Sequence, residues 1–164
     1  IPTVSGQTQL PGNEYKASLV KYENKKNSPY MSLDISKAYP EAAGISSWNR
    51  TVRLNRGKNV LVTDEIDLKA PGDITQHLMT IYPSEVAQPG QLLIHFKDKE
   101  NRVRDFVVQY DPNKMGVEVE KVKLEAPEDK GIIQKWGDTI YRINFKANEP
   151  KSKDKMSFMI SEKQ

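Results

Sequence analysis

Apolar residues along this chain recur at every second position rather than at every third or fourth. The alternation is clear at residues 31–35, 92–96 and 141–145, where successive apolar positions are separated by a single residue. This period places the apolar side chains on one face of an extended strand, whereas a helix needs a period near 3.6. The pattern therefore predicts about ten strands and no long helix.

Turn-forming residues interrupt the alternating stretches at intervals that suit short strands. These breaks lie at residues 11–12, 71–72, 89–90 and 111–112, and each contains proline. We expect an antiparallel all-β fold, either a β-sandwich or a layered β-sheet, forming one domain over residues 1–164. Residues 38–44 are expected to add at most one helical turn.

Two local patterns lead to more specific predictions. Val117 and Val119 share one parity and Val122 the other, which predicts a β-bulge near residues 120–121. Residues 136–139, Trp-Gly-Asp-Thr, separate two strand-like stretches and predict a tight turn between them.

The composition narrows the possible classes of protein. A chain of 164 residues with 37% apolar and 29% charged residues has the size and balance of a globular domain. The net charge of +3 is too small to argue for nucleic-acid binding. No stretch approaches the roughly 18 consecutive apolar residues that a membrane span needs. Because the chain has no cysteine, disulfides and thiolate metal sites are excluded.

Several short motifs occur in an order that resembles a known family. They lie between Ile1 and about Tyr82 and are Thr3-Val-Ser-Gly-Gln-Thr-Gln9, Asp34-Ile-Ser-Lys-Ala-Tyr39, Trp48-Asn-Arg50, Arg56-Gly57, Val62-Thr-Asp64 and His77-Leu78. Each motif alone is common, but the ordered set resembles the C-terminal β-domain of heparinase II/III-like polysaccharide lyases. Since the chain starts with Ile1, we expect it to be part of a longer protein.

The resemblance implies a function for the longer protein. In that family the β-domain packs against a helical (α/α) toroid, and the cleft between them cleaves uronate-containing acidic polysaccharides by β-elimination. This reaction requires the carboxylate to be neutralised, a base and an acid, and the family supplies these mostly from the toroid. We therefore expect no catalytic residue in this chain, and we expect the isolated chain to be inactive. In the full-length protein, it would form one wall of the substrate cleft and stabilise the toroid. The resemblance also implies a bacterial protein exported to the periplasm or the exterior.

A missing toroid has a structural consequence. A sheet face that normally packs against helices would be apolar and, in this chain alone, exposed.

The family resemblance also implies a metal site in some members, where two histidines and one aspartate hold zinc. Asp34 and His77 match two of these positions. Structural zinc almost always takes four ligands, so we expect no cofactor in this chain and leave zinc as a prediction for the full-length parent. The alternatives are a turn-bonded Asp34 and a His77 that only packs and hydrogen-bonds.

Candidate substrate-binding residues are Arg50, Trp48 and Trp136. The planar guanidinium of arginine suits bidentate contact with carboxylate or sulfate, and flat indole rings can stack on sugars. The alternatives are ordinary strand charge for Arg50 and core packing for the tryptophans. Tyr39, before Pro40, is expected to anchor the corner through a hydroxyl bond to backbone.

Two other functions remain open at this point. The chain could be an autonomous carbohydrate-binding module, which requires exposed aromatic residues on one surface. It could also be a structural β-domain without sugar contact.

Overall fold

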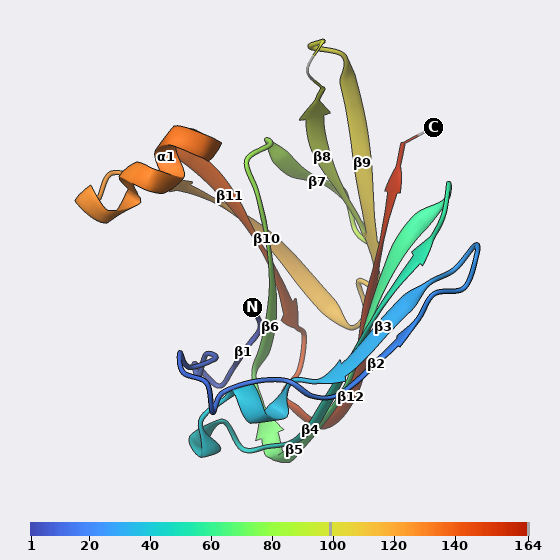
Figure 1. Cartoon of the computed structure of the whole chain (residues 1–164), viewed down its shortest axis with the longest axis vertical. Helices are drawn as coiled ribbons and strands as arrows, with labels where there is room; N and C mark the ends of the chain where they lie inside the picture. The colour runs from blue at the N-terminus through green and yellow to red at the C-terminus, as the bar shows by residue number, and fades with distance from the viewer. Residues whose placement is uncertain (99, 164) are drawn as a thin grey trace.

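The computed structural model describes residues 1–98 and 100–163, and the strands there form two antiparallel sheets (Figure 1). The small sheet has the order β1 (Thr3–Val4), β6 (Ile74–Thr80), β11 (Thr139–Ala147) and β10 (Met115–Lys123). The large sheet has the order β2 (Ser18–Glu23), β3 (Tyr30–Asp34), β4 (Ile45–Asn55), β5 (Asn59–Gly72), β12 (Lys151–Glu162), β9 (Val103–Tyr110), β8 (Gln91–Lys97) and β7 (Ser84–Gln88). The predicted layered all-β fold is confirmed.

Helical structure in the described residues is short. It consists of the 3₁₀ turns η1 (Ser36–Ala38), η2 (Glu41–Ala43) and η3 (Pro127–Asp129) and of the α-helix α1 (Lys130–Trp136). The prediction of no long helix is confirmed, and residues 38–44, where at most one helical turn was expected, contain all of η2 and only the last residue of η1. None of the helices in residues 1–98 and 100–163 has the length and apolarity needed to cross a bilayer.

The core lies where the two sheets face each other. Phe145 of β11 stacks on Phe158 of β12, with ring centroids 5.3 Å apart and an interplanar angle of 8°. Tyr110 of β9 meets Phe145 edge-on at 5.6 Å. Each aromatic side chain removes about 150–250 Å² from water, so these contacts supply much of the force that holds the sheets together.

The two sheets differ greatly in width. Seven spacings of about 4.8 Å make the eight-stranded sheet about 34 Å wide, whereas three spacings make the four-stranded sheet about 14 Å wide. The small sheet therefore covers less than half of the inner face of the large sheet. Tyr39 covers Trp48 on the remaining part of that face, and another part of it is left open.

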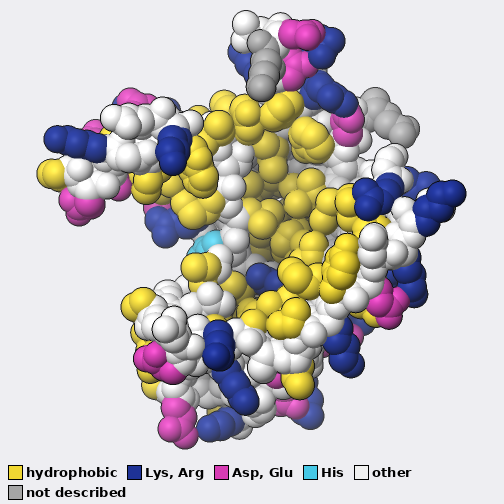
Figure 2. Space-filling model, in the orientation of Figure 1, with side chains coloured by type: hydrophobic (Ala, Val, Ile, Leu, Met, Phe, Trp, Pro, Cys, Tyr) yellow, Lys and Arg dark blue, Asp and Glu magenta, His cyan; other side chains and the backbone are white. Residues whose placement is uncertain are grey.

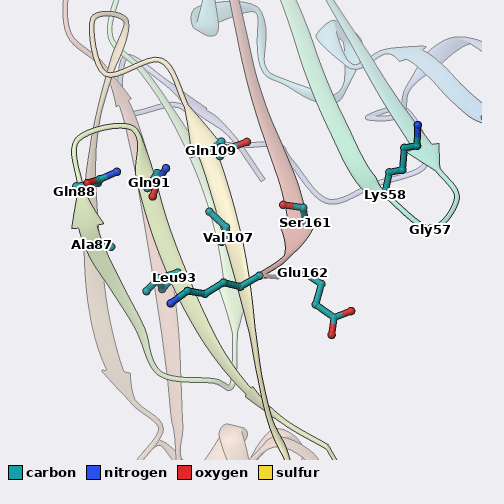
Figure 3. Close-up of a pocket in the computed structure, with 11 residues that line it drawn as sticks. Gly57, Lys58, Ala87, Gln88, Gln91, Leu93, Val107, Gln109, Ser161 and Glu162 are labelled. Carbon is teal, nitrogen blue, oxygen red and sulfur yellow. The ribbon is translucent and has the colours of Figure 1, made fainter.

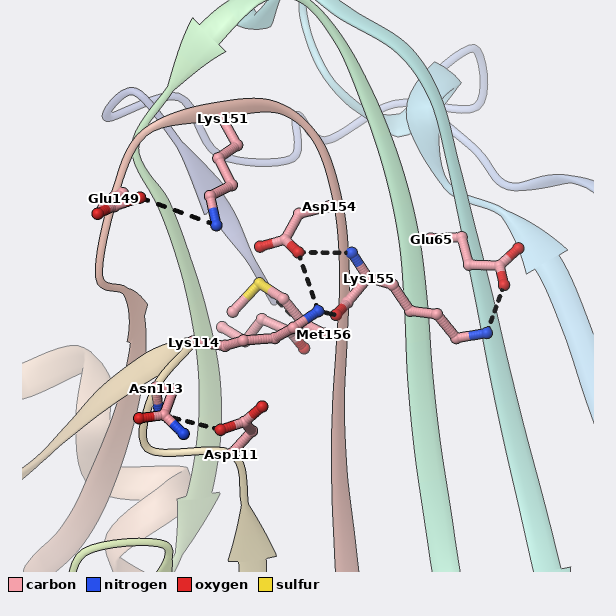
Figure 4. Close-up of polar contacts among 10 residues, drawn as sticks. Glu65, Asp111, Asn113, Lys114, Glu149, Lys151, Asp154, Lys155 and Met156 are labelled. Carbon is pink, nitrogen blue, oxygen red and sulfur yellow. Dashed lines mark hydrogen bonds and ion pairs between the residues drawn. The ribbon is translucent and has the colours of Figure 1, made fainter.

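A polar contact joins the two sheets at one end (Figure 4). The ammonium group of Lys114, directly before β10, lies 3.4 Å from the carboxylate of Asp154 and donates to the carbonyl of Lys155 at 2.8 Å. The Asp154 side chain is only 7% exposed, so the carboxylate of the pair is largely removed from water, whereas the Lys114 side chain is 40% exposed. The contact fixes β10 of the small sheet against β12 of the large sheet.

The predicted β-bulge near residues 120–121 is wrong. Strands β10 and β11 pair without interruption from Met115 and Ala147 to Lys123 and Thr139. The change of parity is nevertheless real and occurs in both strands, because Ile143 and Ile140 of β11 are both buried. The buried side therefore changes along this pair without an inserted residue.

The predicted turn at residues 136–139 has a different context from the one expected. Trp136 is the last residue of α1, and the Gly137 N–H donates to the carbonyl of Ile133 at 2.9 Å. Gly137 has φ 85°, a conformation that costs glycine little. The turn therefore joins α1 to β11 rather than one strand to another, because the strand-like pattern before Trp136 belongs to a helix.

Candidate functional site

Arg50 lies on the inner face of β4 and is tied to a buried carboxylate. Its Nε and Nη2 atoms donate to Oδ1 and Oδ2 of Asp64 at 2.8 and 3.0 Å. Asp64, on the neighbouring strand β5, is 0% exposed. Trp48 Nε1 donates to the same Oδ1 at 2.6 Å. The carboxylate is thus neutralised by a bidentate arginine and receives a third hydrogen bond from an indole.

The polar group also connects the two sheets. Arg50 Nη2 donates to Oε1 of Gln76 on β6 at 3.0 Å, and Gln76 Nε2 lies 3.9 Å from the sulfur of Met156 on β12. Gln76 is 2% exposed. The sequence indicated Arg50 but not these partners, although Asp64 shares its parity with the apolar residues Val60, Val62 and Ile66, a pattern that could have singled it out. Nothing in the pattern indicated Gln76, because its partner lies on another sheet.

The open part of the large sheet carries apolar side chains on the same face as the core. Register places Tyr22 opposite Met31, Met31 opposite Val52, and Val86 opposite buried Leu92. The exposed fractions are 65% for Tyr22, 42% for Met31, 39% for Leu54 and 42% for Val86. We call this surface the open inner face, and it comprises Tyr22, Met31, Leu54, Val60, Val86, Ile94, Phe96, Phe106 and Ile160.

The open inner face is concave and continuous with the core. Figure 2 shows hydrophobic side chains gathered over a hollow, with charged side chains mainly at its margins. Part of it is an aromatic cluster in which Phe96 meets Tyr82 at 4.8 Å and Phe106 at 5.9 Å, both edge-on. An uncovered apolar surface of this kind typically marks a site of contact with another folded unit. The sequence-based expectation of an exposed apolar sheet face is met.

The two candidate tryptophans have different environments. Trp48 is 0% exposed and stacks on Tyr39 at 6.1 Å, so it offers no free ring face to a sugar and fits the core-packing alternative. Trp136 is 52% exposed at the end of α1. The structure therefore does not bring Trp48 and Trp136 together in one binding surface, and sugar stacking by Trp136 stays a prediction.

Tyr39 anchors the corner as expected. Its hydroxyl donates to the backbone carbonyl of Pro2 at 2.8 Å. Burial raises the pKa of Tyr39 to about 12, while the positive charge of Arg50 acts in the opposite direction with a smaller effect. The hydroxyl is thus held in its neutral, donating form.

Asp34 and His77 lie on the outer faces of different sheets. Asp34 Oδ1 accepts hydrogen bonds from the backbone N–H groups of Ser36 and Trp48, at 2.8 and 3.2 Å. His77 Nδ1 lies 2.7 Å from Asn144 Oδ1, and its Nε2 lies 3.4 Å from the hydroxyl of Thr3.

The implied zinc site does not fit this arrangement, because the thickness of the sandwich separates Asp34 from His77. In the part of the chain that is described, no three His, Asp or Glu side chains are grouped to hold a metal ion. The contacts of Asp34 fit the alternative in which it is bonded within a turn, and those of His77 fit the alternative in which it packs and forms hydrogen bonds.

The other arginines of β4 and its turn do not extend a basic surface around Arg50. The Arg53 guanidinium lies over the ring of Tyr30 at 4.8 Å, on the outer face of the sheet. Arg56 donates to the carbonyl of Lys26. Arg50 and Arg53 lie on opposite faces of β4, so the three arginines do not form one continuous patch.

Comparisons with known proteins identify the fold but no sequence family. No protein-family model and no curated protein matches the chain. Among solved structures, it is similar to the heparan sulfate lyase HepC from Pedobacter heparinus, with a TM-score of 0.68, 14% identity and coverage of 98% of this chain and 23% of that chain. It is also similar to a heparinase III, with a TM-score of 0.61, 12% identity and coverage of 98% and 22%. Another heparinase III gives a TM-score of 0.59, 13% identity and coverage of 90% and 21%.

These similarities establish a shared fold with part of the heparinase III structures. The resemblance inferred from the sequence motifs is therefore confirmed at the level of the fold. The chain spans less than a quarter of the length of the structures that it matches.

Proposed function

We propose that this chain is the non-catalytic β-domain of a heparinase III-like polysaccharide lyase. In the full-length protein it would wall one side of the substrate cleft and stabilise a helical toroid domain. The substrates would be uronate-containing acidic polysaccharides, cleaved by β-elimination with groups supplied mainly by the toroid. The observation that carries this proposal is the open inner face, an apolar concave surface within a fold shared with much longer lyases.

The chemistry of the described side chains supports a non-catalytic role. The guanidinium that could neutralise a uronate, that of Arg50, already holds Asp64 with two bonds. His77, a possible proton acceptor, is engaged by Asn144 at 2.7 Å on the opposite side of the small sheet. A base, an acid and a cation converging on one sugar would have to come from another domain.

The proposal is tested by breaking the contact in the full-length gene product. Met31→Glu with Leu54→Glu introduces charge on the open inner face, and Ser32→Glu with Thr63→Glu introduces the same charge on the outer face. We expect the inner-face pair to split thermal unfolding into two transitions and to lower lyase activity on heparan sulfate. The outer-face pair should leave both unchanged. Equal behaviour of the two pairs, or a gene product without a helical domain, would overturn the proposal.

A carbohydrate-binding module is the second candidate, favoured by the 52% exposure of Trp136. Under that proposal the isolated chain retains an acidic oligosaccharide on an affinity gel, and Trp136→Ala abolishes the retention. Ile132→Ala, on the same helix, removes a comparably exposed apolar residue and is the matched control. Unchanged retention in Trp136→Ala would remove the support for this candidate.

A further inference from the structure

We propose that the outer face of the large sheet carries a second binding groove, distinct from the open inner face, for a linear acidic oligosaccharide. The proposal deepens the proposed function, because it concerns the same class of polymer, but it rests on different residues. The groove has a volume of about 880 Å³ and is lined by residues of β12, β9, β8 and β7, of the turn between β4 and β5, and by Lys163 after β12 (Figure 3).

Three glutamines form a row across adjacent strands of this groove. Register places Gln88 of β7 opposite Gln91 of β8, and Gln91 opposite Gln109 of β9. Leu92 and Val108 are fully buried on the inner side, so Gln91 and Gln109 point outward. Figure 3 shows the three glutamines on neighbouring strands. The row therefore presents three side-chain amides at the spacing of the strands.

Amides in such a row suit a ligand rich in hydroxyl groups. Each glutamine amide offers two donors and one accepting oxygen, and a sugar hydroxyl both donates and accepts. Leu93 and Val107, directly opposite each other, add an apolar strip beside the row. A surface that combines amides with small apolar areas fits the mixed C–H and hydroxyl faces of a sugar ring better than it fits a purely ionic ligand.

The charges of the groove favour an anionic ligand. Lys58, in the turn between β4 and β5, and Lys163, directly after β12, are both exposed. Glu162 also borders the groove, but Arg104 binds it at 2.7 and 2.8 Å and neutralises it. Among the residues that the structure describes, the ammonium group of Lys163 has one ion contact, with Asp105 at 3.9 Å. Two ammonium groups therefore remain available to carboxylate or sulfate groups.

The dimensions favour an extended ligand that crosses the strands. From β7 to β12 the groove spans three strand spacings, or about 14 Å, and the β4–β5 turn that carries Lys58 borders it beyond β12. The backbone groups of β8, β9 and β12 beneath it are paired with strands on both sides, so a peptide could not add a strand between them. Recognition would have to use side chains alone, which suits a polymer whose own hydrogen-bonding groups lie along its length.

The groove is tested with the 164-residue chain and ligands of matched length. Heparan sulfate, hyaluronan and neutral cello-oligosaccharides are titrated by calorimetry, together with a poly-glutamate peptide of equal charge. We expect saturable binding of at least one acidic oligosaccharide and none of the neutral one or the peptide. The comparison of sulfated with unsulfated ligand distinguishes sulfate from carboxylate as the recognised anion.

Variants assign the binding to the groove. Gln91→Ala with Gln109→Ala should weaken binding at least about tenfold, since two hydrogen-bonding side chains are lost. Lys58→Gln with Lys163→Gln should weaken it and reduce its dependence on salt. Gln134→Ala with Lys135→Gln, exposed on α1, is the matched control and should have no effect.

Three outcomes would overturn the proposal that this groove binds an acidic oligosaccharide. These are no binding of any acidic oligosaccharide, equal binding of the neutral oligosaccharide or of the peptide, and unchanged binding in the groove variants. Its failure is distinguishable from that of the proposed function, because the groove variants leave the open inner face intact. In the full-length protein, the groove variants would therefore leave the docking of the β-domain on the helical domain unchanged.

Discussion

At the scale of single residues, the most constrained group is the carboxylate of Asp64. It is completely buried, yet three hydrogen bonds from Arg50 and Trp48 satisfy it. A buried ion pair adds little net stability over an apolar pair, but removing one partner leaves the other uncompensated. Asp64 and Arg50 therefore act mainly as a geometric link between β4, β5 and, through Gln76, the small sheet.

We predict that Asp64→Ala lowers the free energy of unfolding by about 3 kcal/mol or more, because Arg50 and the indole N–H of Trp48 lose their acceptor. Urea denaturation measures the change. Glu65→Ala, which removes the exposed pair with Lys155 shown in Figure 4, is the control and should cost less than about 1 kcal/mol. Similar losses in both variants would contradict the role assigned to Asp64.

A pH prediction follows from Tyr39. Its pKa in the folded state, about 12, lies above the value near 10 of an unfolded tyrosine. The fold therefore favours the protonated hydroxyl, and this stabilisation is complete below pH 10 and is lost as the pH rises towards 12.

Tyr39→Phe should be less stable than the parent chain at pH 7, by about 0.5–1.5 kcal/mol, because the bond to the Pro2 carbonyl is lost. Its stability should also fall less steeply between pH 10 and pH 11.5, as measured by denaturation at each pH. Tyr22→Phe, on the exposed edge strand, is the control and should follow the parent. Parallel curves for Tyr39→Phe and the parent would show that Tyr39 does not titrate as inferred.

At the scale of elements, the packing of β10 against β12 depends on a polar contact as well as on apolar burial. Lys114 pairs with Asp154, whose side chain is 7% exposed, and donates a hydrogen bond to the backbone carbonyl of Lys155. We predict that Lys114→Ala lowers the free energy of unfolding by about 1–3 kcal/mol, since a nearly buried carboxylate loses its partner.

The same variant should speed amide exchange in β10 more than in β4. Lys151→Ala, which removes only the 3.9 Å surface pair with Glu149, is the control and should change neither quantity measurably. Uniform acceleration of exchange across both sheets would mean that Lys114 stabilises the fold globally rather than this junction.

The elements also show where sequence patterns succeed and where they mislead. Alternation located strands β3, β8 and β11 because the apolar side chains of each strand lie mainly on the inner face of its sheet. The same alternation could not show that β10 and β11 pair without a bulge, because the buried parity changes along β11 although no residue is inserted. Helix α1 was missed because seven residues are too few to display a helical period.

At the scale of the whole molecule, the dominant feature is the mismatch between a sheet of eight strands and one of four. We predict that the isolated chain binds the dye ANS at the open inner face and self-associates as its concentration rises. Met31→Lys with Leu54→Lys should reduce both effects, measured by fluorescence and sedimentation. Val103→Lys with Met79→Lys removes apolar residues that are 62% and 53% exposed elsewhere, and should have a smaller effect. Equal reductions would argue against a single docking surface.

The sequence by itself determined the all-β class, the resemblance that the fold confirms, and the division of most strands into a buried and an exposed side. It did so because strand periodicity and turn residues are local properties of the chain. Only the tertiary structure decided that Arg50 is bound to Asp64 and Gln76, that Trp48 is enclosed, and that Asp34 and His77 are far apart. It also decided that three glutamines from three strands share one groove, because strand order and register are set by contacts between residues distant in sequence.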